Sequence, residues 1–189
     1  MIKTEQFEKV EVASAADLRA WLAANHGQEA SVWLVTYLAA VPEKYLSRDA
    51  VLDELVAYGW IDGIRRKVDS ERTMQMISPR KVEYWAQSYK DRAARLEAEG
   101  RMAAPGRASV ERGKASGLWD FMADVDALIV PDDLAAALTA AGADFEAFAP
   151  SYRRNVLRWI KLAKTDATRS KRIQKAAETA ARGEKMTNF

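Results

Sequence analysis

The spacing of apolar residues changes once along the chain, and this change limits the folds that the sequence can form. Before Pro79, runs rich in β-branched and aromatic residues, such as residues 31–38 (SVWLVTYL), predict strands, and segments with helical spacing separate them. After Pro79 only the helical spacing remains. We therefore expect an α+β fold, with a small N-terminal sheet and helices over residues 1–83, followed by an all-helical half over residues 84–189, joined as one compact unit.

Caps and helix breakers set the expected boundaries. Ser14 and Ser47 are expected N-caps, and Gly59 is expected just beyond a helix end. His26, the single histidine, stands in the last turn of a helix, where a capping role is favoured over catalysis. Strands are expected at residues 7–12, 31–38, 60–68 and 72–78, and helices at 14–26, 47–58, from the turn at 78–81 to Gly100, 105–116, 131–141, 152–163 and 166–182.

The composition excludes several classes of chemistry. Of 189 residues, 49% are hydrophobic and 30% are charged, which is typical of an ordinary globular protein. The absence of cysteine excludes disulfides, thiol nucleophiles, thiolate metal sites and iron–sulfur clusters. The N-terminus has no apolar signal region, and no run approaches the roughly 18 apolar residues that span a bilayer. We expect a cytoplasmic protein with no membrane span, no metal and no cofactor.

The stretch AYGWIDGIRRK, residues 57–67, is the first candidate site. Alternation places Trp60 and Asp62 on one face of a strand, where the aspartate needs a donor such as Arg65, Arg66 or Arg80. The favoured interpretation is structural, with Asp62 tying the turn to an arginine. The alternatives are a pocket with Trp60 as a wall and arginines as anion donors, and a general acid or base role for Asp62.

The sequence Ser78-Pro79-Arg80-Lys81 is expected to be a turn that enters a helix, whose free N–H groups favour anions. A helix start with solvated bases is the competing interpretation, and the glycine loops of nucleotide sites are absent. Six residues form the candidate ligand-binding site: Trp60, Asp62, Arg65, Arg80, Lys81 and Trp85.

The C-terminal half separates its charges. Residues 119–150 carry seven acidic residues and no lysine or arginine, and residues 151–185 carry eleven bases against three acids. The two segments either pair with each other or leave a basic surface for an acidic protein, another anion or nucleic acid. No aromatic residue is expected among the exposed bases, which weakens the nucleic-acid interpretation. The basic face consists of Arg153, Arg154, Arg158, Lys171 and Arg172.

Several short motifs cover nearly the whole chain. They are GWIDG at 59–63, SPRK at 78–81 with Trp85 after it, EGRM at 99–102, and a block from 150 to 173 that contains SYRR, Trp159-Ile160 and Thr168-Arg169. With these motifs the chain resembles the YdeI/OmpD-associated family, also described as bacteriocin-protection proteins. The resemblance implies an association with an outer-membrane porin, by name, and with protection against bacteriocins or cationic antimicrobial peptides.

The resemblance brings no catalytic residues with it. Many relatives carry a cysteine in the arrangement CFGWIDG, whereas this chain has Ala57 and Tyr58 before Gly59, so any chemistry of that cysteine is absent here. We expect a non-catalytic, cofactor-free binding protein, linked through the resemblance to stress or bacteriocin protection, whose ligand is an anionic small molecule or a protein segment. A nucleic-acid-binding regulator that uses the basic C-terminal helices is the alternative, and a hydrolytic enzyme ranks third.

Overall fold

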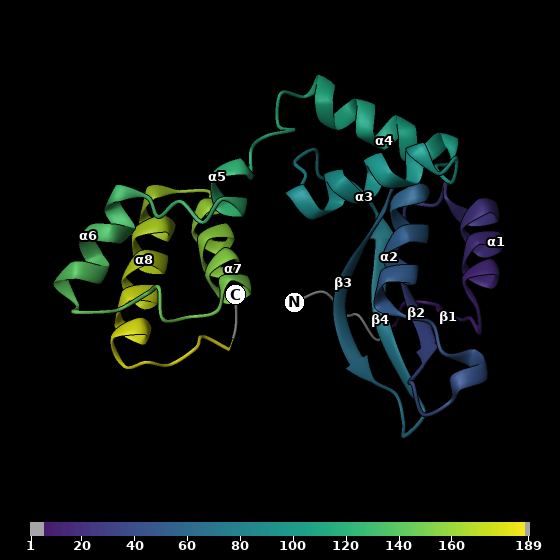
Figure 1. Cartoon of the computed structure of the whole chain (residues 1–189), viewed down its shortest axis with the longest axis horizontal. Helices are drawn as coiled ribbons and strands as arrows, with labels where there is room; N and C mark the ends of the chain where they lie inside the picture. The colour runs from purple at the N-terminus through teal and green to yellow at the C-terminus, as the bar shows by residue number, and fades with distance from the viewer. Residues whose placement is uncertain (1–5, 188–189) are drawn as a thin grey trace. The chain divides into compact units, whose positions relative to one another are not determined.

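The chain divides into two compact units, unit 1 up to Asp120 and unit 2 from Phe121 onward (Figure 1). The computed structural model describes residues 6–187. The division differs from the sequence-based boundary at residue 83, because two helices that follow the sheet pack within unit 1. The predicted α+β fold class is confirmed, with a four-stranded sheet in the N-terminal part and helices in the C-terminal part.

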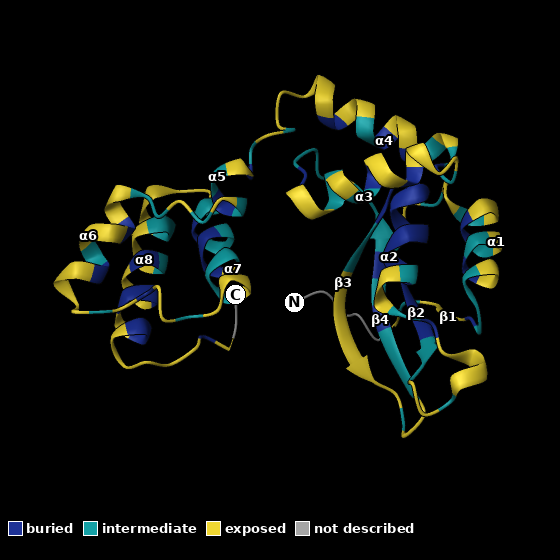
Figure 2. Cartoon of the chain, viewed as in Figure 1, coloured by how far each residue is buried: buried dark blue, intermediate teal, exposed yellow. Residues whose placement is uncertain are grey.

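Unit 1 is built on a sheet with the strand order β1-β2-β4-β3. Strand β1 (Lys9–Glu11) pairs in parallel with β2 (Val32–Tyr37). Strand β4 (Arg72–Pro79) pairs in antiparallel fashion with both β2 and β3 (Trp60–Lys67). Strand β3 is therefore an edge strand, and Figure 2 shows it exposed beyond its first residues.

Helices α1 (Ala15–Asn25) and α2 (Arg48–Ala57) pack on one face of this sheet. The Ser14 hydroxyl accepts a hydrogen bond from the Asp17 amide, and the Ser47 hydroxyl accepts one from the Ala50 amide, so both predicted N-caps are confirmed. A short 3-10 helix, η2 (Pro42–Lys44), lies between β2 and α2. The core beneath these helices contains Val10, Val12, Leu18, Leu22, Val32, Leu34, Leu46, Val51, Leu55, Trp60 and Ile77.

A β-bulge in β3 changes the face that its later residues occupy. Asp62 lies opposite Ile77 and Arg65 lies opposite Gln75, so three steps along β3 match two steps along β4. The extra residue leaves Asp62 and Arg65 on the same face of the sheet, although regular alternation would place them on opposite faces. The bulge thus brings Arg65 to the face of the sheet on which Asp62 lies.

The prediction of a helix start at Pro79 was wrong. Pro79 ends β4 opposite Trp60, residues 80–86 form no regular element, and helix α3 (Gln87–Ala98) begins only after them. The Arg80 amide donates to the Gly59 carbonyl, which continues the pairing of β4 with the start of β3 instead of opening a helix. The proposed anion site at a helix N-terminus is therefore absent at residues 78–81.

Helix α4 (Ala104–Ala115) contacts the end of α2 through small residues. A Cβ atom added at Gly106 would lie 2.2 Å from the Ala57 carbonyl oxygen, and one added at Gly113 would lie 2.7 Å from the Trp85 indole nitrogen. Only glycine permits this approach. Gly59, which follows α2 at a φ of +72°, lies under the same helix, near the carbonyl of Pro105.

In the part of unit 2 that the structure describes, up to residue 187, the helices are α5 (Ala123–Asp126), α6 (Asp132–Ala140), α7 (Pro150–Lys161) and α8 (Asp166–Ala181). Its interior is formed by the apolar stripes of α6, α7 and α8, with Leu134, Leu138, Val156, Leu157, Ile160, Ile173, Ala176, Ala177 and Ala180 buried. Within residues 6–187, no helix combines the length and the apolar character that crossing a lipid bilayer requires.

Candidate ligand-binding site

Asp62 is held by a chain of hydrogen bonds on the helix side of the sheet. Its carboxylate accepts one bond from the Gln75 amide nitrogen at 2.8 Å and another from the Tyr89 hydroxyl. Arg65 donates to Gln75 at 2.8 Å, and Arg48 lies 3.9 Å from the carboxylate. The expectation that Arg65, Arg66 or Arg80 pairs directly with Asp62 was wrong, because Gln75 and Tyr89 fill these positions.

Arg80 lies between aromatic rings. Its guanidinium carbon is 4.0 Å from the centre of the Trp85 ring and 5.2 Å from that of Tyr89, and Nη1 donates to the Tyr84 carbonyl. Burial lowers the pKa of Arg80 to about 10, which leaves it charged at neutral pH. Burial and the hydrogen bond to Asp62 raise the pKa of Tyr89, so this phenol stays a neutral donor.

The structure separates the candidate site residues into groups. Tyr89 joins Asp62 to Arg80, and Arg80 lies over Trp85. Trp60 is instead a buried core residue, 1% exposed, and its ring lies nearly perpendicular to that of Trp21, with the ring centres 5.5 Å apart. Lys81 is exposed. Trp60 is therefore packed in the core and does not form the wall of an open pocket.

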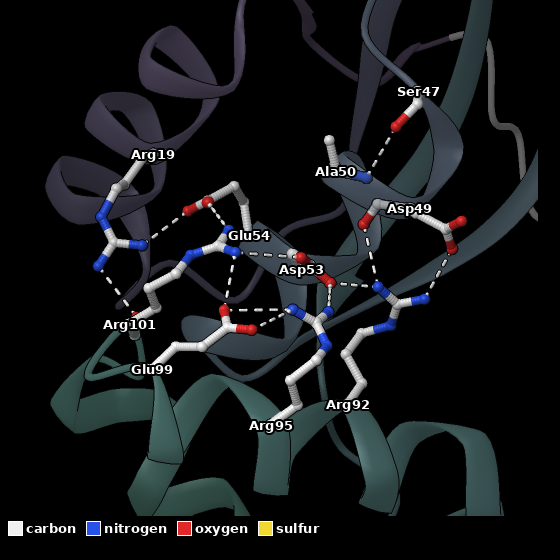
Figure 3. Close-up of polar contacts among 10 residues, drawn as sticks. All are labelled: Arg19, Ser47, Asp49, Ala50, Asp53, Glu54, Arg92, Arg95, Glu99 and Arg101. Atoms are coloured by element: carbon white, nitrogen blue, oxygen red, sulfur yellow. Dashed lines mark hydrogen bonds and ion pairs between the residues drawn. The ribbon is translucent and has the colours of Figure 1, made fainter.

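A second polar cluster joins α2 to α1 and α3 and was not foreseen from the sequence (Figure 3). Asp53 and Glu54 are 7% and 3% exposed, yet both are acidic. Asp53 accepts from Arg92, Arg95 and Arg101, and Glu54 accepts from Arg19 and Arg101. We call the whole set the α2 ion-pair network: Arg19, Asp49, Asp53, Glu54, Arg92, Arg95, Glu99 and Arg101.

The α2 ion-pair network contains four arginines and four carboxylates, so its formal charges cancel. Burial acts to raise the pKa of Asp53, but hydrogen bonds from Arg95 and Arg92 outweigh it, and the pKa falls below its ordinary value. A buried carboxylate that is matched in this way holds elements together and has no proton to exchange near neutral pH. The network is structural.

A cavity of about 440 Å³ lies between α3 and α4. Helix α2 contacts both helices: α3 through the arginines of the ion-pair network, and α4 through the glycine contacts. The cavity walls combine the apolar residues Ala93, Ala94, Met102, Val110 and Trp119 with the charged residues Lys90, Glu97, Arg107, Glu111 and Lys114.

Two lysines mark one end of the α3–α4 cavity. The ammonium of Lys90 lies 5.2 Å from the centre of the Trp119 ring, and that of Lys114 lies 5.8 Å from it. Trp119 in turn packs against Trp85 at 5.3 Å between ring centres. At another point on the wall, Arg107 of α4 pairs with Glu97 of α3 at 2.8 Å, and both side chains are about half exposed.

The basic segment of unit 2, residues 151–185, pairs in part with the acidic segment that precedes it. Lys161 pairs with Asp124, and Arg169 pairs with Asp133. Arg153 lies 4.0 Å from Glu146, and Arg154 donates to the Asp126 carbonyl. Of the remaining residues of the predicted basic face, Arg172 donates to the Trp159 carbonyl, Arg158 is half-buried, and Lys171 is exposed. These contacts pair part of the basic segment with the acidic one, and whether the two segments neutralise each other stays a prediction.

One argument against nucleic acid needs correction. The half-buried ring of Trp159 lies 5.0 Å from the guanidinium carbon of Arg172 and 5.9 Å from the ammonium of Lys175. An aromatic residue therefore does lie among the bases of α8, because Trp159 is at the margin of the apolar stripe of α7 and not at its centre.

Together, the fold and the site define a two-unit α+β protein with a ligand-sized cavity in unit 1. Within the described part of the chain, no group of three histidine or acidic side chains is arranged to hold a metal ion. The model of a domain of unknown function (DUF8412) matches residues 10–109, and the model described as "Bacteriocin-protection, YdeI or OmpD-Associated" matches residues 127–183. The first match covers more than half of the chain, which therefore belongs to the family of this domain of unknown function, whereas the second match shows that residues 127–183, in unit 2, are similar to the YdeI/OmpD-associated bacteriocin-protection family.

The two matches divide the motifs between them. GWIDG and the residues around Asp62 lie in the first match, and the SYRR and Thr168-Arg169 motifs lie in the second. No curated protein and no solved structure gives a significant match. The α3–α4 cavity begins inside the first match and extends beyond it to Trp119.

Proposed function

We propose that this chain is a non-catalytic binding protein whose ligand occupies the α3–α4 cavity. The ligand would be a small molecule with an apolar body and an anionic group, which keeps the first of the two ligand classes expected from the sequence. One observation supports this proposal most directly. Lys90 of α3 and Lys114 of α4 both approach the Trp119 ring, at one end of a largely apolar cavity. Its volume of about 440 Å³ lies within the usual range of small-molecule sites.

The chemistry of the cavity wall supports binding over catalysis. The wall contains no serine, threonine, cysteine or histidine, so it offers none of the usual nucleophiles or neutral-pH bases. Its acidic residues, Glu97 and Glu111, each pair with a base. Such a site can desolvate an apolar group and fix an anion, and these two capacities define the proposed ligand.

The cluster around Asp62, Arg65 and Arg80 is the less favoured location for an anion. Its carboxylate already accepts two hydrogen bonds, and Arg80 is covered by Trp85 and Tyr89. The nucleic-acid alternative rests on Trp159 with Arg172 and Lys175 in unit 2. Binding of a single-stranded oligonucleotide that weakens steeply with salt would favour it over the cavity. The cytoplasmic location stays a prediction.

A blocking substitution tests the cavity. Ala94 lines the cavity but is exposed, so Ala94→Trp fills the space without disturbing the core. Decanoate, which has an apolar body and an anionic group, serves as the probe ligand. We expect Ala94→Trp to weaken decanoate binding, measured by isothermal titration calorimetry, by more than about tenfold. Ala98→Trp is the matched control, because Ala98 is exposed on the same helix and does not line the cavity.

The comparison of the two variants decides the proposal. It is supported if Ala98→Trp binds decanoate like the parent chain and Ala94→Trp does not, with both melting at the parent's temperature. Equal binding by the two variants, or no decanoate binding by the parent, would exclude the cavity as the ligand site.

A further inference from the structure

We propose that Asp120 is a built-in competitor for the ligand's anionic group, and that it therefore limits affinity and selects which anions bind. This inference rests on the proposed function of the α3–α4 cavity. In the free protein the Asp120 carboxylate binds the Lys90 ammonium at 2.6 Å. A ligand whose anion reaches Lys90 has to displace it.

The two partners of this ion pair differ in exposure. The Lys90 side chain is 9% exposed, lines the cavity and lies beside the Trp119 ring, whereas the Asp120 side chain is 80% exposed. A nearly buried ammonium needs a counter-charge, but the carboxylate that supplies it can return to water at little cost. The ligand's anion can therefore replace Asp120 as the counter-charge of Lys90, so that the lysine keeps an anionic partner throughout.

Lys114 makes the exchange favourable for a ligand. Its ammonium lies near the same Trp119 ring, and its own partner Glu111 is 70% exposed. Asp120 is paired with Lys90, and Glu111 with Lys114, so each internal carboxylate serves one base. An anionic group placed at the Trp119 end of the cavity would be attracted by both ammonium groups. Carboxylates, sulfates and phosphates on an apolar body meet this requirement, whereas neutral or cationic head groups do not.

The test compares two ligands with the same apolar body. Decanoate carries a charge that competes with Asp120, and decanol does not. Because the Asp120 side chain is 80% exposed, water offsets much of its attraction to Lys90, so Asp120→Asn should tighten decanoate binding by about two- to fivefold and leave decanol binding unchanged. Calorimetric titration of the full chain measures both dissociation constants.

Two further variants separate competition from a general charge effect. Asp91→Asn removes one acidic charge from α3 at an exposed residue whose carboxylate accepts from Gln87, and it should leave decanoate binding unchanged. In a Lys90→Met background, Asp120→Asn should no longer alter the affinity for decanoate, because the two residues act through one contact.

The possible failures are distinguishable. If Asp120→Asn leaves decanoate affinity unchanged, or Asp91→Asn raises it equally, Asp120 is no competitor, while an intact response to Ala94→Trp still supports the cavity. If decanoate does not bind at all, or binds independently of Ala94→Trp, both the cavity and the competition are overturned. Tighter decanoate binding that is confined to Asp120→Asn and lost in Lys90→Met supports the inference.

Discussion

The two units hold their helices by different means. In unit 1, α3 is tied to α2 through carboxylates that are buried, and α4 is docked by glycines that let backbones touch. In unit 2, apolar stripes form the interior and the ion pairs lie at the surface, as between Arg169 and Asp133. Ion pairs are thus buried between the packed helices in unit 1, whereas in unit 2 they lie outside the apolar interior.

This difference follows from the burial of the carboxylates, because the distances between partners along the chain are similar in the two units. The arginines that bind Asp53 lie 39, 42 and 48 residues away, so the buried carboxylate is acceptable only once the tertiary structure has formed. In unit 2, Lys161 and Arg169 lie 37 and 36 residues from their carboxylates, but those carboxylates are 47% exposed and keep their charges in contact with water. Loss of one partner should therefore have very different consequences in the two units.

The largest effect is expected from Asp53→Asn. The substitution keeps the side chain's size but leaves the hydrogen bonds from three arginines without their buried, charged acceptor, which should lower the free energy of unfolding by about 3 kcal/mol. Urea unfolding followed by tryptophan fluorescence in a Trp159→Phe background reports on unit 1 alone, because the other five tryptophans lie there. Asp91→Asn is the exposed control on α3, and a loss below about 1 kcal/mol would contradict a structural role for the network.

A smaller effect is expected from Gly106→Ala. The new Cβ would meet the Ala57 carbonyl oxygen, which belongs to the backbone and cannot turn aside, so α4 must shift at a cost of about 1–3 kcal/mol. The same fluorescence assay measures it. Gly27→Ala serves as the control, since no atom lies within 4 Å of the added Cβ. Equal stability of the two variants would show that α4 does not depend on this close approach.

The smallest effect is expected from Asp133→Asn in unit 2. Arg169 donates to both oxygens of this carboxylate at 2.7 and 2.8 Å, but the side chains are 47% and 32% exposed. We expect a loss below about 1 kcal/mol that shrinks further in salt. Amide hydrogen exchange of α6 and α8 measures it. A loss comparable to that of Asp53→Asn would erase the contrast between the units.

Much of the fold was predictable because local signals decide it. The N-caps at Ser14 and Ser47, the helix end before Gly59 and the paired strands β3 and β4 all depend on residues close in sequence. The start of α3 was missed because Ser78-Pro79 resembles a helix entrance, yet strand pairing with Trp60 outweighs that local preference.

The candidate site was predictable only in part. The sequence predicted that Asp62 needs hydrogen-bond donors. It did not predict the β-bulge or the donor Tyr89, which is distant along the chain, because neither produces a local sequence pattern. Two adjacent acids, Asp53 and Glu54, among the apolar residues of α2 were the one available signal for the ion-pair network. The α3–α4 cavity depends on how three helices pack, and no motif encodes that.

The bulge in β3 also affects how the protein behaves at high concentration. An edge strand offers unpaired backbone groups to any other strand, and a regular one invites edge-to-edge aggregation. Here the ladder is interrupted between Asp62 and Arg65, and the strand ends in Arg65, Arg66 and Lys67. The same irregularity that places an arginine beside Asp62 therefore makes the edge a poor template for a second copy of the chain.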